Sequence, residues 1–359
     1  MKIWAWIIPI VLALSIWSVG GILGAATQAP SPVPPSPQQA PGHGDQPQYG
    51  SFGQQAASIQ ALTSIGSDLL YAGSFGLGLF RSEDRGINWA KSGQGVTDPF
   101  ILTLTTGKDG AIYAGTFRGG VFRSRDQGKS WQAINNGLKR LEIKALLAVS
   151  DGVYAGTSDG VYRLAADRWS VVTTGLDDIL VHALALSSDG TLFAGTSGKG
   201  ILRFKAQSTG WVRQQHGLKD HEGMMESFIR VLTIDPEGGI YAGTFDGGVF
   251  SSADGGTTWR PISRALPNDS IRGILFNSRG LFVATGHGIF KTTDKGRQWL
   301  PLNNGLTSMA IQVLIESGAG VLYAGTSDGA FRSDDDGRTW NPINQGLEGG
   351  QAPAPFNFR

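Results

Sequence analysis

The sequence predicts an all-β protein assembled from seven copies of one unit of about 40 residues. An eight-residue pattern, S-x-D-x-G-x-T-W, ends at Trp340, and close variants of it recur along the chain. An apolar, alternating stretch opens each unit, and a second strand with a central aromatic residue follows it. Charged residues make up only 16% of the chain and 53 residues are glycine, which is typical of short strands joined by tight turns. Four short strands in each unit indicate four-stranded antiparallel blades, and seven such units indicate a seven-bladed β-propeller.

The chain begins with an uncharged segment, residues 3–26, which is long enough to span a bilayer. Its end, Gly24-Ala25-Ala26, resembles the small-residue site at which a signal peptide is cleaved. Residues 1–26 are therefore expected to be either a signal peptide or an N-terminal membrane anchor. Both interpretations place the bulk of the chain outside the cytoplasm, in a periplasm, on a cell surface or secreted, because Lys2 is the only early positive residue.

A Pro-, Gln- and Gly-rich stretch, residues 27–55, follows and cannot build a hydrophobic core. It is expected to be a semi-extended spacer, which favours a tether to the membrane. The propeller is expected at residues 56–347, and residues 348–359 are expected to be a disordered tail. The strand that might clasp the ring shut is left open, with Tyr49–Gln55 as one suggestion.

The seven units are defined by two series of residues. The first strands begin at Ile59, Ile101, Ile143, Val181, Ile229, Ile271 and Ile311. The second strands carry Tyr71, Tyr113, Tyr154, Phe193, Tyr241, Phe282 and Tyr323. No unit can bury both of its faces alone, so the ring is expected to fold as one domain.

The repeated eight-residue pattern predicts the turn between the third and fourth strands. Its Ser or Thr hydroxyl and its Asp carboxylate can hold nearby backbone N–H groups, its Gly suits a positive φ, and its Trp can wedge between blades. A part that recurs in every unit serves the unit, so these carboxylates are assigned a structural role. They are Asp84, Asp126, Asp254, Asp294 and Asp335. Two decayed copies keep only the tryptophan, Trp169 and Trp211.

These residues resemble the Asp-box (BNR) repeat family of β-propellers, and the resemblance covers about residues 59–347. It implies that the boxes lie on the outer rim, away from the ligand face. It does not imply one function, since the family includes sialidases, xyloglucan-active glycoside hydrolases, sortilin-type receptors and the photosystem II assembly factor. The single seven-bladed layout is most similar to that of the assembly factor.

One linker between units departs from the repeat. Twelve positions separate Trp89 from Ile101 and the other regular pairs, whereas eighteen separate Trp211 from Ile229. Loops that depart from a rigid repeat are where function tends to lie, so this insertion is a candidate contact for a partner. Its apolar residues could equally plug the channel. The candidate residues are His221, Glu222, Met224, Met225 and Glu226, for which a metal-binding role is not expected.

A second candidate site is formed by the turns between the second and third strands. Because strands alternate in direction, these turns are expected on the same face as the linkers, around one mouth of the central channel. Their variable residues give a ring of mixed charge that suits a polar ligand or a protein surface. The ring residues are Arg118, Asp159, Lys199, Asp246, His287 and Asp328. Solvated turn residues are the simpler interpretation of each one alone.

Catalysis is not favoured. A glycosidase needs two carboxylates at a fixed separation, and the Asp residues of these turns are expected for turn chemistry alone. Arg230 and Arg272 on neighbouring first strands suggest a sialidase-like site that is incomplete, because the Arg-Ile-Pro sequence of that family is absent and seven units replace six. No catalytic residue and no metal site is assigned, and no cofactor is expected.

Two functions therefore remain open at this stage. The first is a non-catalytic, extracytoplasmic propeller that binds a protein, in the manner of a scaffold or of the assembly factor, with a membrane complex as one possible partner. The second is a polysaccharide-binding or polysaccharide-cleaving propeller. Nucleic acid is not expected as a partner, because the formal net charge is only +1 and no Lys/Arg cluster stands out. A membrane is a partner only if residues 3–26 are retained.

Overall fold

The computed structural model describes residues 56–206, 208–214, 216–219, 227–267 and 270–348. Contacts divide the chain into Met1–Ser51 and Phe52–Arg359, and every described residue belongs to the second unit. The signal or anchor segment, the spacer and almost all of the tail lie outside the described residues, so these expectations stay predictions. Within the described part, no helix is long and apolar enough to cross a membrane.

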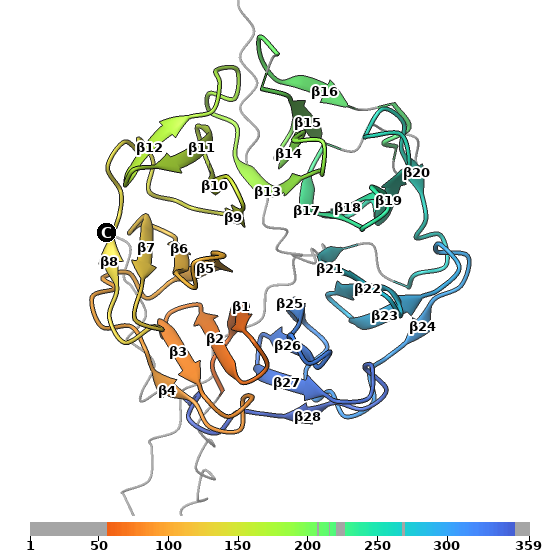
Figure 1. Cartoon of the computed structure of the whole chain (residues 1–359). Coiled ribbons are helices and arrows are strands. Elements are labelled where there is room, and N and C mark those ends of the chain that lie inside the picture. The colour runs from red at the N-terminus through yellow and green to blue at the C-terminus, as the bar shows by residue number, and fades with distance from the viewer. Residues whose placement is uncertain (1–55, 207, 215, 220–226, 268–269, 349–359) are drawn as a thin grey trace, which may run out of the picture. The chain divides into compact units, whose positions relative to one another are not determined.

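The described residues confirm the predicted all-β, seven-bladed propeller of four-stranded antiparallel blades (Figure 1). The innermost strands are β1 (Ile59–Ile65), β5 (Ile101–Thr106), β9 (Ala145–Val149), β13 (Val181–Leu186), β17 (Ile229–Ile234), β21 (Ile271–Asn277) and β25 (Ile311–Glu316). The second strands are β2 (Leu69–Ser74), β6 (Ile112–Thr116), β10 (Gly152–Thr157), β14 (Leu192–Thr196), β18 (Ile240–Thr244), β22 (Gly280–Thr285) and β26 (Leu322–Thr326).

The third and fourth strands complete each blade toward the perimeter of the ring. The third strands are β3 (Leu79–Ser82), β7 (Val121–Ser124), β11 (Gly160–Ala165), β15 (Ile201–Phe204), β19 (Val249–Ser252), β23 (Gly288–Thr292) and β27 (Gly329–Ser333). The outer strands are β4 (Ala90–Lys91), β8 (Gln132–Ala133), β12 (Arg168–Val171), β16 (Val212–Gln214), β20 (Arg260–Pro261), β24 (Leu300–Pro301) and β28 (Asn341–Pro342).

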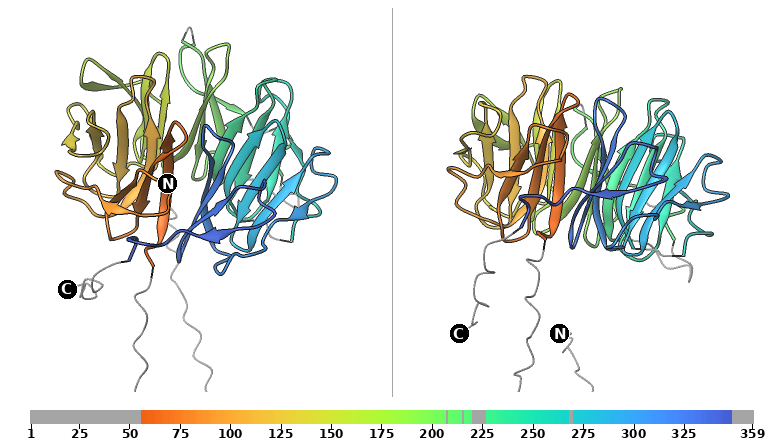
Figure 2. Two further views of the ribbon diagram at one scale, coloured as in Figure 1. Left: turned by 60° about the horizontal axis from the view of Figure 1, so that its bottom comes forward. Right: turned by 90° about the horizontal axis from the view of Figure 1, so that it is seen from below.

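Among the described residues, the ring closes without a strand exchanged between the first and last blades, and an isolated antiparallel bridge joins Ala56 to Glu348. Each blade consists of four consecutive strands, and the two ends of the ring meet where Ala57 donates its N–H to Leu347 O at 3.1 Å. Both ends therefore lie on the same face (Figure 2). Ile59 packs so closely on Gly325 that a Cβ at the glycine would lie 2.7 Å from its Cγ2, as Ile143 does on Gly115. The closing seam thus repeats the other seams, and the suggested edge strand lies outside the described residues.

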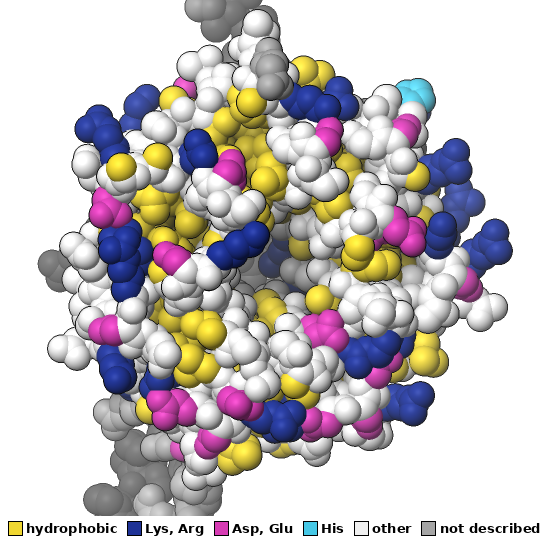
Figure 3. All heavy atoms as spheres, viewed as in Figure 1, with side chains coloured by type: hydrophobic (Ala, Val, Ile, Leu, Met, Phe, Trp, Pro, Cys, Tyr) yellow, Lys and Arg dark blue, Asp and Glu magenta, His cyan; other side chains and the backbone are white. Residues whose placement is uncertain are grey.

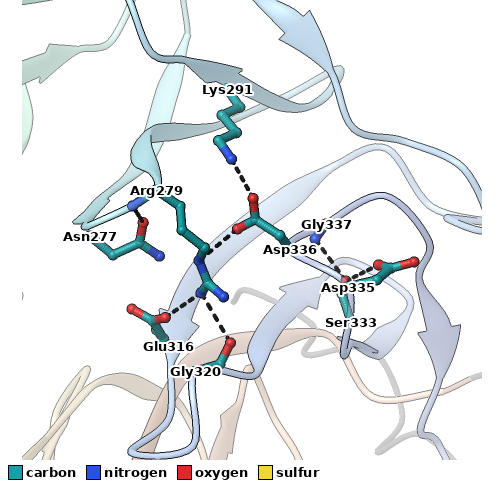
Figure 4. Close-up of polar contacts among 9 residues, drawn as sticks. All are labelled: Asn277, Arg279, Lys291, Glu316, Gly320, Ser333, Asp335, Asp336 and Gly337. Atoms are coloured by element: carbon teal, nitrogen blue, oxygen red, sulfur yellow. Dashed lines mark hydrogen bonds and ion pairs between the residues drawn. The ribbon is translucent and has the colours of Figure 1, made fainter.

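The Asp-box turns form in the way the pattern predicts (Figure 4). In the last box, Ser333 Oγ donates to Asp335 Oδ1 at 2.8 Å and accepts the N–H of Gly337 at 2.8 Å. Asp335 Oδ1 accepts the N–H of Thr339 at 2.8 Å, and Oδ2 accepts its hydroxyl at 2.6 Å. Two consecutive residues are left-handed, Asp336 with φ 64° and Gly337 with φ 81°. The pattern predicted a positive φ only for the glycine.

The box tryptophans join each blade to the preceding one. The indole N–H of Trp340 donates to Leu302 O at 2.9 Å, and its backbone N–H donates to Asn304 O at 2.9 Å. Four more tryptophans donate their indole N–H across a seam in the same way: Trp89, Trp131, Trp169 and Trp299. Trp169 belongs to a decayed box, so the tryptophan still joins two blades where the carboxylate of the box is absent.

Blade 4 departs from this arrangement on both of its sides. Trp211 is only partly buried, and its buried indole N–H has no hydrogen-bond partner among the described residues. Trp259, on the following blade, donates its indole N–H within its own box to Gly256 O at 3.0 Å. It contacts blade 4 through its backbone N–H, which donates to His216 O at 2.8 Å.

Charged side chains add a clamp between blades 6 and 7 (Figure 4). Arg279, after β21, forms ion pairs with Glu316 and with Asp336, the latter at 2.9 Å without hydrogen-bond geometry, and donates to Gly320 O at 3.0 Å. Lys291 of β23 pairs with the same Asp336. Two cations and two carboxylates balance each other here, so the cluster is a structural contact between blades.

Candidate functional site

The turns between second and third strands meet the linkers on one face of the ring. Gly76 donates its N–H to Pro99 O at 3.1 Å, and Gly120 donates to Leu141 O at 3.0 Å. We call this the linker face, and the Asp boxes stand at the other ends of the strands. Figure 3 views the ring along its axis from the opposite face, where the molecule is hollowed at its centre and side chains of both charges mix around the rim.

The six turn residues predicted to form a ring are carried by these turns. Five of them are exposed: Arg118, Lys199, Asp246, His287 and Asp328. The sixth, Asp159, is half-buried and accepts hydrogen bonds from the Tyr162 hydroxyl at 2.9 Å and the Thr157 hydroxyl at 2.8 Å. Its carboxylate therefore staples its own turn. None of the six lines the cavity described below, so their role as a binding ring stays a prediction.

The structure does not describe the candidate residues of the inserted linker. His221, Glu222, Met224, Met225 and Glu226 lie outside the described residues. Its described end, Phe228, bridges to Ser197 and is 53% exposed on the linker face. The described end of the insertion therefore lies on the linker face, and contact of the inserted residues with a partner stays a prediction.

A cavity of about 400 Å³ opens at the channel on the linker face, and we call it the channel mouth. Each blade supplies the residue that follows a buried Ile or Val at the start of its inner strand or, in blade 3, just before it. These residues are Gln60, Leu102, Lys144, His182, Arg230, Arg272 and Gln312. Four further residues at the cavity are apolar. Three come from blade 5 or the linker before it, Phe228, Ile229 and Phe245, and the fourth is Val313 of blade 7.

A β-bulge sets the direction of these side chains. Ile229 pairs with Thr244 and Val231 with Gly243, so Arg230 between them is the extra residue of β17. The same shift occurs in β1, β5, β13, β21 and β25. A bulge leaves one residue out of the ladder and re-aims its side chain, which explains why this residue faces the channel in six of the blades. In blade 3 the equivalent residue, Lys144, stands directly before β9.

Two arginines dominate the electrostatics of the channel mouth. Arg230 of β17 and Arg272 of β21 lie on neighbouring inner strands, and neither forms an ion pair within the described part of the chain. The buried Nε of Arg272 has no hydrogen-bond acceptor there. Burial lowers the pKa of both guanidinium groups, and the charge of Arg272 lowers that of Arg230 further. Two unbalanced cations are therefore held side by side at a partly dry site.

The other basic residues of the channel mouth are balanced or neutral. Lys144 Nζ pairs with Glu142 Oε1 at 2.9 Å. The pKa of His182 is lowered to about 4, first by burial and then by the charges of Lys144 and Arg230, with Glu142 acting in the opposite direction. The neutral ring nitrogen Nε2 lies 2.6 Å from Ser197 Oγ. At neutral pH the excess positive charge therefore resides on the two arginines.

Phenylalanines on the linker face remain exposed to solvent. Phe75 is 52% exposed and contacts Phe100 edge to face at 4.8 Å, and Phe245 is 60% exposed. The guanidinium of Arg230 lies 5.8 Å from the centroid of the Phe245 ring. Lys144 lies 5.6 Å from the ring of Phe117. Large apolar side chains beside unbalanced cations are typical of a surface that binds another molecule.

The cavity offers little for hydrolysis. Within the described part, no carboxylate lines it, and no group of three His, Asp or Glu side chains is placed to hold a metal. Two other hollows, of about 510 and 310 Å³, lie on the rim beside Trp89 and Trp299. Both are made of Asp-box residues at equivalent places in the repeat, so they follow from the shape of the rim.

Among the residues of the channel mouth, the sequence reasoning named Arg230 and Arg272 and the aromatic residues Phe228 and Phe245. The polar and apolar residues at the equivalent positions of the other blades follow a signal that was available, because each stands one position after the predicted start of a first strand. A position that recurs in every blade but carries different side chains indicates a binding site, whereas a position that keeps one residue type indicates a structural role. Alternation alone did not show it, because the bulge reverses the expected side-chain direction.

These features define the class of the protein: it is a single seven-bladed β-propeller with Asp-box turns. The model of the BNR-Asp box repeat matches residues 79–92, which are the third strand and box of blade 1. No curated protein sequence matches the chain.

Solved structures are similar in fold. The extracellular domain of a putative hybrid two-component system from B. thetaiotaomicron has a TM-score of 0.67 at 19% identity, over 80% of this chain and 40% of that one. This chain thus spans less than half of that domain. YCF48 bound to D1 peptide has a TM-score of 0.61 at 14% identity, over 77% and 92% of the two chains. The Niastella koreensis GH74 enzyme has a TM-score of 0.63 at 14% identity, over 82% and 55%. At these sequence identities, the similarity shows that the fold is shared and nothing further.

Proposed function

We propose that the protein is a non-catalytic propeller that acts outside the cytoplasm, tethered to a membrane, and binds a protein partner on its linker face during assembly of a complex. The observation that carries this proposal is the channel mouth, where unbalanced arginines stand beside exposed phenylalanines. Arginine and aromatic side chains dominate the binding energy of protein interfaces. The scaffold around them is rigid, so the partner meets a preformed surface.

Two comparisons support parts of the proposal. YCF48, similar in fold, is known with a D1 peptide bound, so a single propeller of this type can receive a polypeptide. The domain from the B. thetaiotaomicron system is extracellular, which is consistent with the uncharged segment predicted at residues 3–26. The membrane tether rests on that segment alone.

The proposal is tested by site-specific photo-cross-linking in the native membranes. The cross-linker replaces Phe245 on the linker face or, as a matched control, Ile87 on an Asp-box turn, which is 55% exposed against 60% for Phe245. We expect a reproducible set of membrane-complex subunits from the Phe245 position and not from Ile87. The same proteins captured from both positions, or no protein captured from Phe245, would contradict the proposal.

A second candidate function is the binding or cleavage of a polysaccharide. The exposed rings of Phe75 and Phe245 favour it, since aromatic faces can stack on sugar rings, and a GH74 enzyme shares the fold. A glycan array tests binding. If a glycan binds, Asp159→Asn, Asp246→Asn and Asp328→Asn test cleavage, and unchanged turnover in all three would remove the turn carboxylates as catalysts.

A further inference from the structure

The channel mouth contains a pair of cations that the fold itself does not balance. Arg230 and Arg272 occupy the same repeat position on adjacent blades, where the other blades carry Gln, Leu, Lys or His. Elsewhere in the described residues, most arginines of the third strands have a carboxylate partner, as Arg123 has in Asp167 and Arg332 in Asp334, whereas Arg203 donates to a backbone carbonyl. The arginine pair is thus a departure from the chemistry of the repeat.

A buried cation without a partner is costly, because desolvation removes its water and nothing replaces it. The Nε of Arg272 is buried without an acceptor among the described residues. An anion that entered the channel mouth would supply the missing acceptors, and each guanidinium presents a planar fork that matches a carboxylate in shape. The low polarity of the surroundings would strengthen the attraction.

Apolar surface lies directly beside the pair. Phe245 is exposed at 5.8 Å from the guanidinium of Arg230, and Ile229 and Val313 also line the cavity. Leu102 of β5 lines the same cavity. A ligand group that carried only charge would leave this surface uncovered, whereas a charged group next to an apolar one would use both.

We infer that Arg230 and Arg272 form a subsite for a carboxylate of the partner, and that the apolar side chain next to this carboxylate packs on Phe245. This inference rests on the proposed function, because it takes the partner to be a protein. The carboxylate can come from a Glu or Asp side chain or from a chain terminus, since the chemistry of the pair accepts both.

The test measures binding of synthetic peptides to the full chain in detergent. One peptide set places Phe next to Glu with an amidated terminus, and a second ends in Phe with a free carboxylate. Control sets replace Glu by Gln, replace Glu by phosphoserine, or amidate the free terminus. We expect one or both carboxylate sets to bind, with about 10-fold loss in the neutral controls and weaker binding at higher salt. Equal binding of the neutral sets, or tighter binding of phosphoserine, would overturn the inference.

Variants locate the subsite. Arg230→Gln and Arg272→Gln should each lower peptide affinity about 10-fold, and Arg230→Lys should recover only part of it, because Lys lacks the planar fork. Arg260→Gln on an exposed outer strand is the matched control and should bind normally. Melting curves identify any variant that fails to fold, and a charge-preserving Arg272→Lys then replaces it. Unchanged affinity in both glutamine variants would overturn the inference.

The outcome separates this inference from the proposed function. If the Phe245 cross-linker captures membrane-complex subunits while no carboxylate peptide binds, the carboxylate subsite is wrong and the protein-binding role stands. If the cross-linker captures nothing, the protein-binding role fails whatever the peptides do.

Discussion

The Asp-box rim and the channel mouth are both built from positions that recur from blade to blade. The rim positions keep the same residue types, whereas the channel-mouth positions vary. At the rim, five boxes keep the same Ser or Thr, Asp and Gly, joined by the same hydrogen bonds. At the channel mouth, the seven equivalent positions carry Gln, Leu, Lys, His, Arg, Arg and Gln. Six of the seven inner strands share the backbone bulge, whereas the side-chain chemistry differs between blades.

This difference separates residues that stabilise the ring from residues that could bind a ligand. A structural contact that every pair of neighbouring blades needs can be repeated without cost to function, because it involves only those two blades. A ligand that sits on the axis meets all seven blades at once and has no sevenfold symmetry, so identical side chains would serve it poorly. Changes at the rim should therefore alter stability, and changes at the channel mouth should alter binding.

The largest effect on stability is expected from Trp340→Ala. This side chain is 2% exposed, packs between blades and donates to Leu302 O. Truncation of a buried tryptophan removes its apolar contacts and leaves a cavity, which should cost about 3–5 kcal/mol. The midpoint of thermal unfolding should fall by several degrees, and binding at the channel mouth of the folded protein should not change.

Trp211→Ala is the matched control within the same repeat. Trp211 is only partly buried and its indole N–H crosses no seam, so about 1–2 kcal/mol is expected. An equal loss in the two variants would mean that the seam contact of Trp340 adds nothing, and the contrast between intact and decayed boxes would disappear.

The next largest effect is expected from Gly305→Ala, compared with Gly175→Ala. Both glycines follow the outer strand of a blade with a positive φ, 89° and 101° respectively. A Cβ at Gly305 would lie 2.1 Å from Trp340 O on the next blade, whereas a Cβ at Gly175 would contact nothing within 4 Å. Both changes carry the backbone strain of about 1 kcal/mol, and Gly305→Ala should add at least about 2 kcal/mol for the clash. Urea unfolding midpoints measure the difference, and equal midpoints would show that blade 7 yields to the added methyl group.

Most of the fold could be predicted from the sequence because each unit repeats the same sequence pattern. The turn chemistry of Ser333, Asp335 and Gly337 and the wedge of Trp340 followed from residue types alone. Closure of the ring did not, since the contact of Ile59 with Gly325 depends on the last blade returning to the first, which no local pattern encodes. The second left-handed residue, Asp336, was also missed, because the five boxes place Arg, Gln, Gly, Lys and Asp there without a common preference.

The candidate site was less accessible. The turn residues such as Arg118 were predicted to surround the channel, and the structure leaves that role untested while it places Arg230 and Arg272 inside the cavity. Strict alternation predicts which side of a strand a residue faces, and a bulge changes that assignment at one position. The absence of balancing carboxylates also depends on which blades become neighbours in space.

A smaller effect is expected from Ser333→Ala in the last box. The variant would remove the acceptor for the N–H of Gly337 and the donor to Asp335, which is expected to cost about 1–2 kcal/mol. Ser170→Ala on the exposed side of an outer strand is the control and should be neutral. Thermal midpoints of the two variants decide the comparison, and a neutral Ser333→Ala would mean that the box is held by its tryptophan and glycine alone.

The smallest effect, and the one that joins stability to the channel mouth, concerns His182. Its pKa is lowered to about 4 from an ordinary value of 6.5, first by burial and then by Lys144 and Arg230, with Glu142 acting in the opposite direction. The folded protein therefore favours the neutral ring, and the unfolded chain binds the proton more readily. This contribution to stability is fully present above pH 6.5 and is lost as the pH falls from 6.5 toward 4.

Because the imidazole ring of His182 is only partly buried, we expect a loss of about 1 kcal/mol over this interval. His182→Gln should flatten that part of the curve of unfolding free energy against pH, while the exposed His287→Gln should leave it unchanged. In Arg230→Gln, the titration of His182 followed by NMR should move toward its ordinary pKa, since one repelling charge is gone. A His182 pKa that does not respond to Arg230→Gln would show that burial alone sets it, and that the arginine charge is already screened at the channel mouth.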